Sequence, residues 1–124
     1  MNIPENLYYT KDHDWVKIEG NVATVGIADY AQSQLGDIVY VDIQTEGESL
    51  DAGEVFGAIE AVKTVIDVHM PLSGTITHVN PELENTPQLM NTDPYGKGWM
   101  IRIDCSNLDE ITNLLSAEAY KQIV

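Results

Sequence analysis

The sequence predicts a mainly β domain, a sandwich or small barrel of short antiparallel strands that carries only two helices. Short runs rich in β-branched and aromatic residues recur along the chain, and Gly, Asn, Asp or Pro separates most of them. Helical periodicity is found only near residue 30 and at the C-terminal end. The 124 residues are enough for one domain with its own core, so we expect a single domain over residues 1–124.

A β-hairpin is the first predicted element. Residues 15–18 and 22–27 are two β-rich runs that flank Glu19-Gly20-Asn21, and a Gly-Asn turn between such runs is typical of a hairpin. Residues 38–43 form the next strand, which is rich in β-branched residues. The remaining predicted strands cover residues 54–61, 64–70, 75–79 and 99–103.

Two helices are predicted. Residues 29–35 can form two helical turns that end at Gly36, because glycine is favoured just after a helix C-terminus. Further along, apolar residues recur at helical spacing, so we expect a helix over about residues 107–122 that packs on the sheet. The apolar positions are Leu108, Ile111, Leu115 and Ala119. Residues 80–98 hold three prolines and two glycines, a composition typical of a functional loop or of a loop with a short helical turn.

The chain is strongly acidic. Six Lys and Arg against 20 Asp and Glu give a net charge of −14. Such a charge repels phosphate backbones and anionic lipid headgroups, so we expect neither nucleic acid nor a membrane surface as a partner. Basic protein surfaces and cationic ligands fit this charge better.

Cysteine use and the N-terminal residues favour the cytoplasm. Cys105 is the only cysteine, so no intramolecular disulfide can form. Residues 1–5 lack the basic and apolar regions of a secretory signal, and no apolar run approaches the roughly 18 residues of a membrane span. We therefore expect a cytoplasmic protein, bacterial rather than the mature form of a mitochondrial matrix protein.

Catalytic and metal-binding signatures are missing. Gly96-Lys97 lacks the upstream glycine and the following Ser or Thr of a phosphate-binding loop. His13, His69 and His78 have no spacing typical of metal ligands. Asp12-His13-Asp14 is interpreted as a solvated loop rather than an acid/base relay, because no nucleophile is evident nearby. We therefore expect a protein that is not an enzyme.

Lys63 is isolated in the sequence, as the only Lys or Arg between Lys17 and Lys97. The two β-runs on either side of it should pair as a hairpin over about residues 54–70, which places Val62 and Lys63 at its tip. No Asn-Gly or Asp-Gly marks this turn, which is unusual for a hairpin selected only for stability. On this evidence alone, an exposed lysine is most often a solubilising charge.

The residues around Lys63 change that interpretation. Phe56-Gly57-Ala58-Ile59-Glu60-Ala61-Val62-Lys63 leads into a strand and then into Pro71-Leu72-Ser73-Gly74. This block resembles the lipoyl-attachment hairpin of the glycine cleavage system H protein family. Further blocks resemble the family in the same order: residues 9–16, 26–32 with 35–39, and 91–100. The lysine is flanked by Val62 and Thr64 instead of the methionines usual in biotinyl domains, which argues against biotin.

The resemblance implies a flattened barrel-sandwich hybrid, the fold of lipoyl and biotinyl domains, with a short central helix and a C-terminal helix. It implies a monomeric, non-catalytic carrier with lipoate covalently attached to Lys63. Such a carrier takes the aminomethyl group of glycine from a pyridoxal-phosphate glycine decarboxylase to a tetrahydrofolate-dependent aminomethyltransferase, and dihydrolipoamide dehydrogenase reoxidises it. A free lysine amine has a pKa of about 10.4 and is a poor nucleophile, so a lipoate ligase or octanoyltransferase would attach the group. The alternative is a protein that stores or relays lipoyl or octanoyl groups for other complexes.

A carboxylate in a shielded cleft is expected to hold the cationic aminomethyl cargo. Asp14 is the first candidate, although the family usually has Glu there, and Asp67 is a weaker one. The alternation of side chains along a strand favours Asp67 as an outward-facing residue of the hairpin over Asp67 as a cargo contact. Ile27 and Leu35 could line the cleft, with core packing as the alternative for both. The other departures from the family pattern are Ala61, Thr64 and Lys97.

Overall fold

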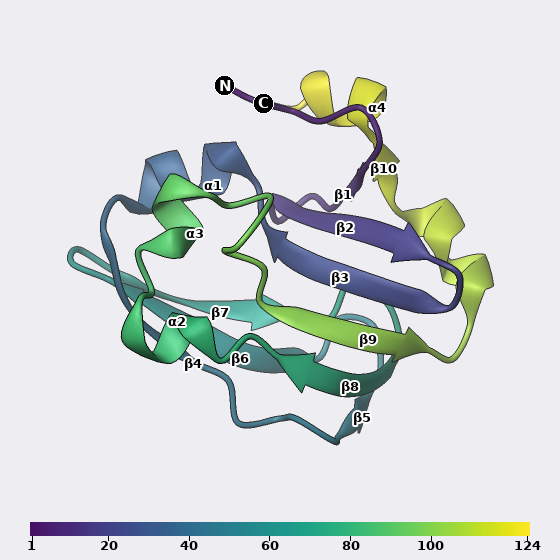
Figure 1. The fold of residues 1–124 in the computed structure, drawn as a ribbon. Coiled ribbons are helices and arrows are strands. Elements are labelled where there is room, and N and C mark those ends of the chain that lie inside the picture. Colours follow the sequence, from purple (N-terminus) through teal and green to yellow (C-terminus); the bar gives the residue numbers. More distant parts are fainter.

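The computed structural model describes all 124 residues, which form two antiparallel β-sheets. The larger sheet holds β1 (Tyr8–Tyr9), β2 (Asp14–Glu19), β3 (Val22–Ile27), β5 (Ser49–Leu50), β8 (Gly74–Val79), β9 (Ile101–Cys105) and β10 (Leu115–Ser116). The smaller sheet holds β4 (Ile38–Asp42), β6 (Val55–Ala61) and β7 (Val65–His69). The strand order is β10-β1-β2-β3-β9-β8-β5 in the larger sheet and β4-β6-β7 in the smaller one. The sheets stack as a flattened sandwich (Figure 1), which confirms the predicted fold class.

The main core fills the space between the two sheets. Val16, Val25 and Ile103 enter it from the larger sheet, and Ile59 and Val68 enter it from the smaller sheet. All five side chains are at most 2% exposed. Burial of each such side chain stabilises the fold by about 1.5–3 kcal/mol, so this core holds β6 and β7 firmly against the larger sheet.

The predicted strands are all present, with ends that differ from the predicted ones by at most two residues. The hairpin of β2 and β3 turns at Gly20, whose φ of +61° is a conformation that glycine adopts without strain. The predicted helix at residue 29 is α1 (Asp29–Leu35), and it ends at Gly36. The loop over residues 80–98 contains two single-turn helices, α2 (Glu82–Asn85) and α3 (Leu89–Thr92).

The prediction of one C-terminal helix over residues 107–122 is wrong. The chain forms a 3-10 helix, η1 (Leu108–Asn113), then the short strand β10, and then α4 (Ala117–Lys121). Helical spacing of the apolar residues was misleading, because these residues pack on two different clusters. Ile111 and Leu114 contact the main core, whereas Ala117 and Tyr120 belong to a second cluster. A continuous helix could not present one face to both clusters, and the extended residues of β10 pair with β1 instead.

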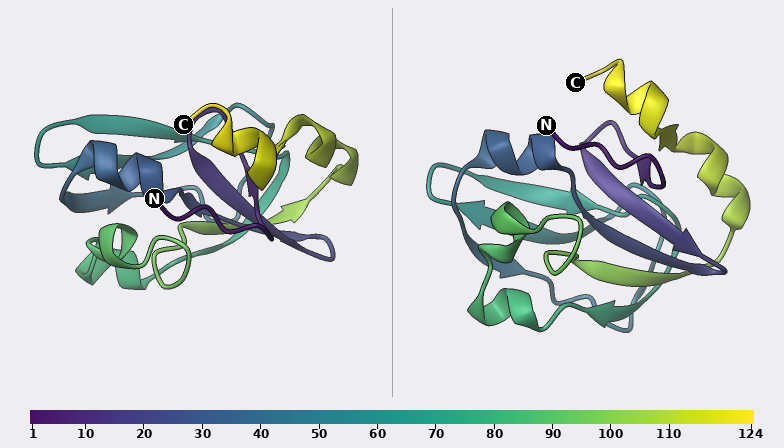
Figure 2. Two further views of the ribbon diagram at one scale, coloured as in Figure 1. Left: turned by 90° about the horizontal axis from the view of Figure 1, so that it is seen from above. Right: turned by 45° about the horizontal axis from the view of Figure 1, so that its top comes forward.

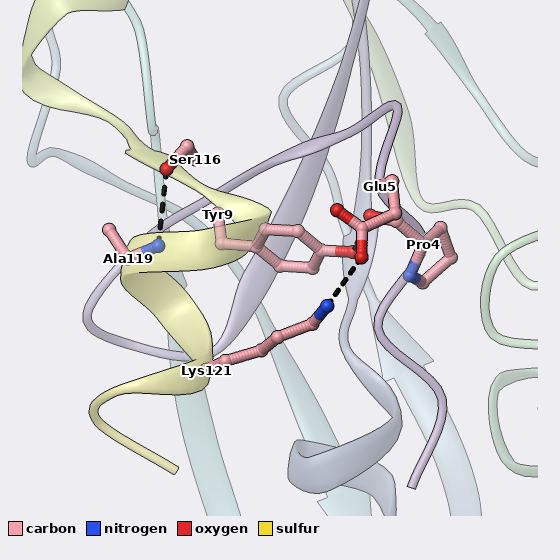
Figure 3. A network of polar contacts seen from close by, with 6 residues as sticks. All are labelled: Pro4, Glu5, Tyr9, Ser116, Ala119 and Lys121. Atoms are coloured by element: carbon pink, nitrogen blue, oxygen red, sulfur yellow. Dashed lines mark hydrogen bonds and ion pairs between the residues drawn. The ribbon is translucent and has the colours of Figure 1, made fainter.

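The second cluster joins the two ends of the chain on one side of the molecule (Figure 2). The rings of Tyr9 and Tyr120 stack with centroids 4.5 Å apart. The Tyr9 hydroxyl donates to the Pro4 carbonyl at 2.7 Å, and Lys121 forms an ion pair with Glu5 (Figure 3). These contacts hold β1 and the turn that follows it, which carries part of the site described below.

At the start of α4, the Ser116 hydroxyl accepts the amide N–H of Ala119 at 3.1 Å (Figure 3). This N-cap gives the helix a defined first residue directly after β10. None of the helices in the structure is both long enough and apolar enough to cross a membrane.

Candidate functional site

Lys63 lies in the turn that joins β6 to β7. This hairpin projects at the edge of the molecule near α1 (Figures 1 and 2). The turn is closed by the Ala61 amide, which donates to the Thr64 carbonyl at 2.8 Å. The Lys63 side chain is exposed and forms neither an ion pair nor a hydrogen bond within the chain. Its amine is therefore accessible to a partner.

The hairpin tip is held by the neighbouring junction between α1 and β4. The amide of Val62 donates to the carbonyl of Asp37 at 3.0 Å. Lys63 lies over Gly36, since a Cβ on Gly36 would come within 3.7 Å of Cε of the lysine. Support from outside the hairpin explains how this turn forms without the Asn-Gly or Asp-Gly that usually stabilises a short hairpin.

Asn91, in α3, holds this junction on both sides of Asp37. Its Nδ2 donates to the Gly36 carbonyl at 2.7 Å, and its Oδ1 accepts the Ile38 amide at 3.0 Å. The side chain thereby satisfies an orphan carbonyl at the end of α1 and the first amide of β4. The chain of contacts runs from Asn91 through the junction to Val62, next to Lys63.

We expect the Asn91→Ala variant to loosen the tip. Loss of two hydrogen bonds to partly buried backbone groups should lower the free energy of unfolding by about 1–3 kcal/mol. Hydrogen exchange of the Val62 amide, measured by NMR, should become at least about tenfold faster. Asn113→Ala is the matched control, because the Asn113 side chain is exposed and makes no hydrogen bond. Equal Val62 exchange in the parent and in Asn91→Ala would contradict this role.

A cavity of about 190 Å³ lies between β7 and the turn that precedes β2. Its polar lining consists of Asp12, Asp14, Asp67 and His69, and its apolar lining consists of Ile66 and Val68. Three carboxyl groups thus line one small space, and none of them forms an ion pair within the chain. Such a lining favours a small cationic ligand.

A larger cavity of about 500 Å³ adjoins the first and shares Asp12, Asp14 and His69 with it. It extends toward the C-terminal segment, where Leu114 and Leu115 line it. The two cavities together form a groove from β7 to β10. Within this structure, no cluster of His, Cys, Asp and Glu has the arrangement of a metal site.

Asp14 is the buried polar group of this groove, with 5% of its surface exposed. The pKa of Asp14 is raised from its ordinary value of 3.8 to about 8, mainly by burial and in smaller part by the nearby Asp12, while a hydrogen bond from Thr10 opposes the rise. A carboxyl group with this pKa is largely protonated at neutral pH. It can lose that proton when a positive charge forms or arrives beside it, because the charge offsets the cost of desolvating the carboxylate.

The structure brings together two of the sequence-predicted site residues, because Asp14 and Asp67 line the same cavity. Ile27 and Leu35 lie elsewhere, in the main core, where they are 1% and 7% exposed. Neither lines the groove, so the core-packing alternative describes both.

The interpretation of residues 12–14 as a solvated loop is wrong for Asp14. Asp14 is already the first residue of β2, where it pairs with Ile27, and the residue is buried. Sequence reasoning also overlooked Asp12 and His69 as groove residues. Side chains alternate between the two faces of a strand, so His69 lies on the same face of β7 as Asp67. This alternation is the sequence pattern that could have indicated His69.

Comparison with known proteins decides the family. The family profile described as Glycine cleavage H-protein matches residues 7–124. The chain belongs to the glycine cleavage H-protein family. It is therefore a lipoyl carrier of the glycine cleavage system, and its partners are enzymes of that system.

Similar proteins from bacteria carry the name glycine cleavage system H protein. The one from Bacteroides fragilis is 56% identical over 124 residues, which cover 100% of this chain and 98% of that protein. The one from Salinibacter ruber is 51% identical over 123 residues, 99% of each chain. The crystal structure of a glycine cleavage system H protein from Mycobacterium marinum is 38% identical, with a TM-score of 0.87 over 97% of each chain.

Proposed function

We propose that Lys63 carries the lipoyl group, and that the chain is a non-catalytic carrier of the aminomethyl group of glycine. The observation that carries this proposal is the unpaired Lys63 amine at an exposed hairpin tip with a rigid backing. When attached, the lipoyl group would supply a disulfide whose S–S bond is reduced as one sulfur accepts the aminomethyl group of the decarboxylated glycine, so that a dithiol remains once that group has been passed on. The lysine fits an acyl group, because its amine has no competing partner in the chain.

The chain itself holds and presents the arm. A lysine amine is mostly protonated at neutral pH, so a lipoate ligase or an octanoyltransferase must activate the acyl group and form the amide. The backing by Asp37 and Asn91 keeps the backbone of the tip in place while the side chain remains free to move. Such an attachment point suits several enzymes that approach it in turn.

The partners we propose are a pyridoxal-phosphate glycine decarboxylase, a tetrahydrofolate-dependent aminomethyltransferase and dihydrolipoamide dehydrogenase. All three must reach the same arm, and the projecting hairpin supports access from several directions (Figure 2). The bacterial relatives and the free, buried Cys105 support the bacterial cytoplasm as the compartment.

The cavity beside β7 is the proposed resting place of the cargo. Asp67 lies four residues from Lys63, about 13 Å along an extended strand, so the cavity opens along the path of an arm that folds back on β7. The Asp14 and Asp67 carboxyls would pair with the amine of the cargo, and Ile66 and Val68 would exclude water from it.

Reconstituted glycine–bicarbonate exchange with the decarboxylase tests the carrier function. The lipoylated chain should support exchange, and the unmodified chain should give only the background rate. Neither chain should turn over glycine without the decarboxylase. Exchange at equal rates with the two chains would refute the proposal, and transfer of the lipoyl group onto a separate acceptor domain would indicate storage or relay instead.

A further inference from the structure

We propose that Thr10 is a positioning residue for Asp14, which leaves carboxyl oxygen Oδ1 free to exchange a proton with the amine of the cargo. This inference rests on the proposed function, in which Asp14 meets the aminomethyl group. It adds Thr10, which lines only the larger of the two cavities and not the one proposed for the cargo. It also assigns different tasks to the two oxygens of the carboxyl group.

The hydrogen bonds of the Thr10 hydroxyl leave it one possible orientation. Its Oγ1 accepts the amide N–H groups of Asp12 and Asp14, each at 3.2 Å. An amide N–H can only donate, so the two bonds occupy both lone pairs of the hydroxyl oxygen. The hydroxyl proton is then the only group left to meet Oδ2 of Asp14, 3.4 Å away, and Thr10 must be the donor in that contact.

The other carboxyl oxygen, Oδ1, has no hydrogen-bond partner in the chain. Every fully buried side-chain oxygen or nitrogen in the structure has such a partner, so Oδ1 must retain contact with solvent. The remaining exposure of Asp14 is toward the two cavities that it lines. With Oδ2 already accepting from Thr10, a protonated Asp14 carries its proton on Oδ1, the oxygen that the cargo can reach.

The backbone of the turn prevents Asp14 from rotating away. The Thr10 amide donates to the Asp14 carbonyl at 3.0 Å, and the His13 amide donates to the Thr10 carbonyl at 3.1 Å. His13 has a φ of +68°, in the left-handed region, and the Ala28 amide donates to its carbonyl at 2.8 Å. These bonds close residues 10–14 into one compact unit.

Proton transfer from Asp14 would protect the cargo. When the neutral amine enters the cavity, the O–H bond at Oδ1 breaks and an N–H bond forms, which leaves an ammonium group beside a carboxylate. Protonation occupies the lone pair with which a neutral amine would expel a neighbouring leaving group. Burial supports this exchange, because it is the main cause of the raised pKa of Asp14, about 8. Asp14 therefore stays mostly protonated at neutral pH as long as no cargo is bound.

Several other titratable groups surround Asp14 and can influence its titration. Those that line the cavities or lie against Asp14 are Lys11, Asp12, His13, Asp67, His69 and Tyr120. None of their side chains contacts the Thr10 hydroxyl, although the backbone amides of Asp12 and Asp14 both donate to it. Thr10→Val therefore removes these two backbone hydrogen bonds together with the contact to the Asp14 carboxyl.

Titration of the Asp14 carboxyl carbon by ¹³C NMR, in the unlipoylated chain, tests the inference. Thr10→Val should raise the pKa of Asp14 by about one pH unit, because a hydrogen bond to the ionised form is lost. Thr10→Ser should restore the parent titration. Thr77→Val is the control, since the Thr77 hydroxyl makes a similar 3.3 Å bond to Arg102 on a strand remote from the cavity. Identical titrations in the parent and Thr10→Val would overturn the proposal.

A measurement on the parent alone covers the case in which Thr10→Val does not fold. The hydroxyl proton of Thr10 should be protected from exchange, and its NMR signal should shift as Asp14 titrates. A rapidly exchanging hydroxyl would also overturn the inference. The cargo site and the positioning role can fail separately. If Asp14→Asn leaves cargo release unchanged, the cargo site is refuted. If Thr10→Val leaves the titration of Asp14 unchanged, only the positioning role is refuted.

Discussion

The Lys63→Arg variant should gain no lipoyl group when it is expressed with lipoate and a lipoate ligase, whereas the parent should gain one. Arginine keeps the positive charge and the length of the side chain. Its guanidinium, with a pKa above about 12, does not become the neutral nucleophile that acylation requires. Intact mass spectrometry distinguishes one added group from none, and glycine–bicarbonate exchange should fall to background.

Lys97→Arg is the matched control for this experiment, because it replaces another lysine outside the hairpin. It should be lipoylated like the parent. The free energy of unfolding of Lys63→Arg should stay within about 0.5 kcal/mol of the parent value, since the side chain is exposed and unpaired. A Lys63→Arg chain that still gained one lipoyl group would place the attachment site elsewhere.

The Asp14→Asn variant should be more stable than the parent, by an amount that grows with pH. The pKa of Asp14 in the folded chain, about 8, lies above its ordinary value of 3.8. The folded state therefore binds the proton more tightly than the unfolded state does. Below about pH 4 this carboxyl group does not reduce the free energy of unfolding. As the pH rises from there toward 8, it lowers the free energy of unfolding by at most about 1.4 kcal/mol per pH unit.

Asparagine has a similar shape and no charge, so it avoids this penalty. We expect the stability difference to be small near pH 4 and on the order of 3–5 kcal/mol at pH 8. Urea unfolding between about pH 5 and pH 8 measures it. Asp67→Asn removes an exposed carboxyl from the same cavity and is the control for the loss of a charge there. A difference that stays constant with pH would contradict an uncharged, buried Asp14.

Asp14→Asn should also weaken retention of the cargo, in spite of its greater stability. Without the carboxyl, the amine loses one charge-assisted hydrogen bond, and release from the loaded chain should become at least about tenfold faster. Opposite effects on stability and on retention are typical of a residue kept for function. Release of formaldehyde or ammonia from the loaded chain, followed over time, measures this effect.

Local patterns in the sequence were sufficient for the strands, for α1 and for the family. Alternating β-rich runs, glycine turns and the block around Lys63 each depend on residues that are close together in the chain. A short stretch of sequence therefore contains each pattern completely. The same patterns led to the hypothesis that Lys63 is the attachment residue.

The C-terminal segment shows where local patterns are insufficient. Leu108, Ile111, Leu115 and Ala119 have helical spacing, but spacing does not reveal that Leu115 pairs with Tyr9, more than a hundred residues earlier. Backbone pairing with β1 and packing on two separate clusters outweigh a helical tendency of a few tenths of a kcal/mol per residue.

The groove was decided by tertiary structure alone. Asp12 and Asp14 meet Asp67 and His69 only because the sandwich brings the turn before β2 against β7. Burial of Asp14, the main cause of its raised pKa, depends on how residues 10–14 pack against elements such as β7. The sequence by itself determined a β-rich carrier with an isolated lysine at a hairpin tip. Only packing between the sheets could decide which carboxyl group is buried and protonated at neutral pH, because desolvation depends on what surrounds a side chain in space.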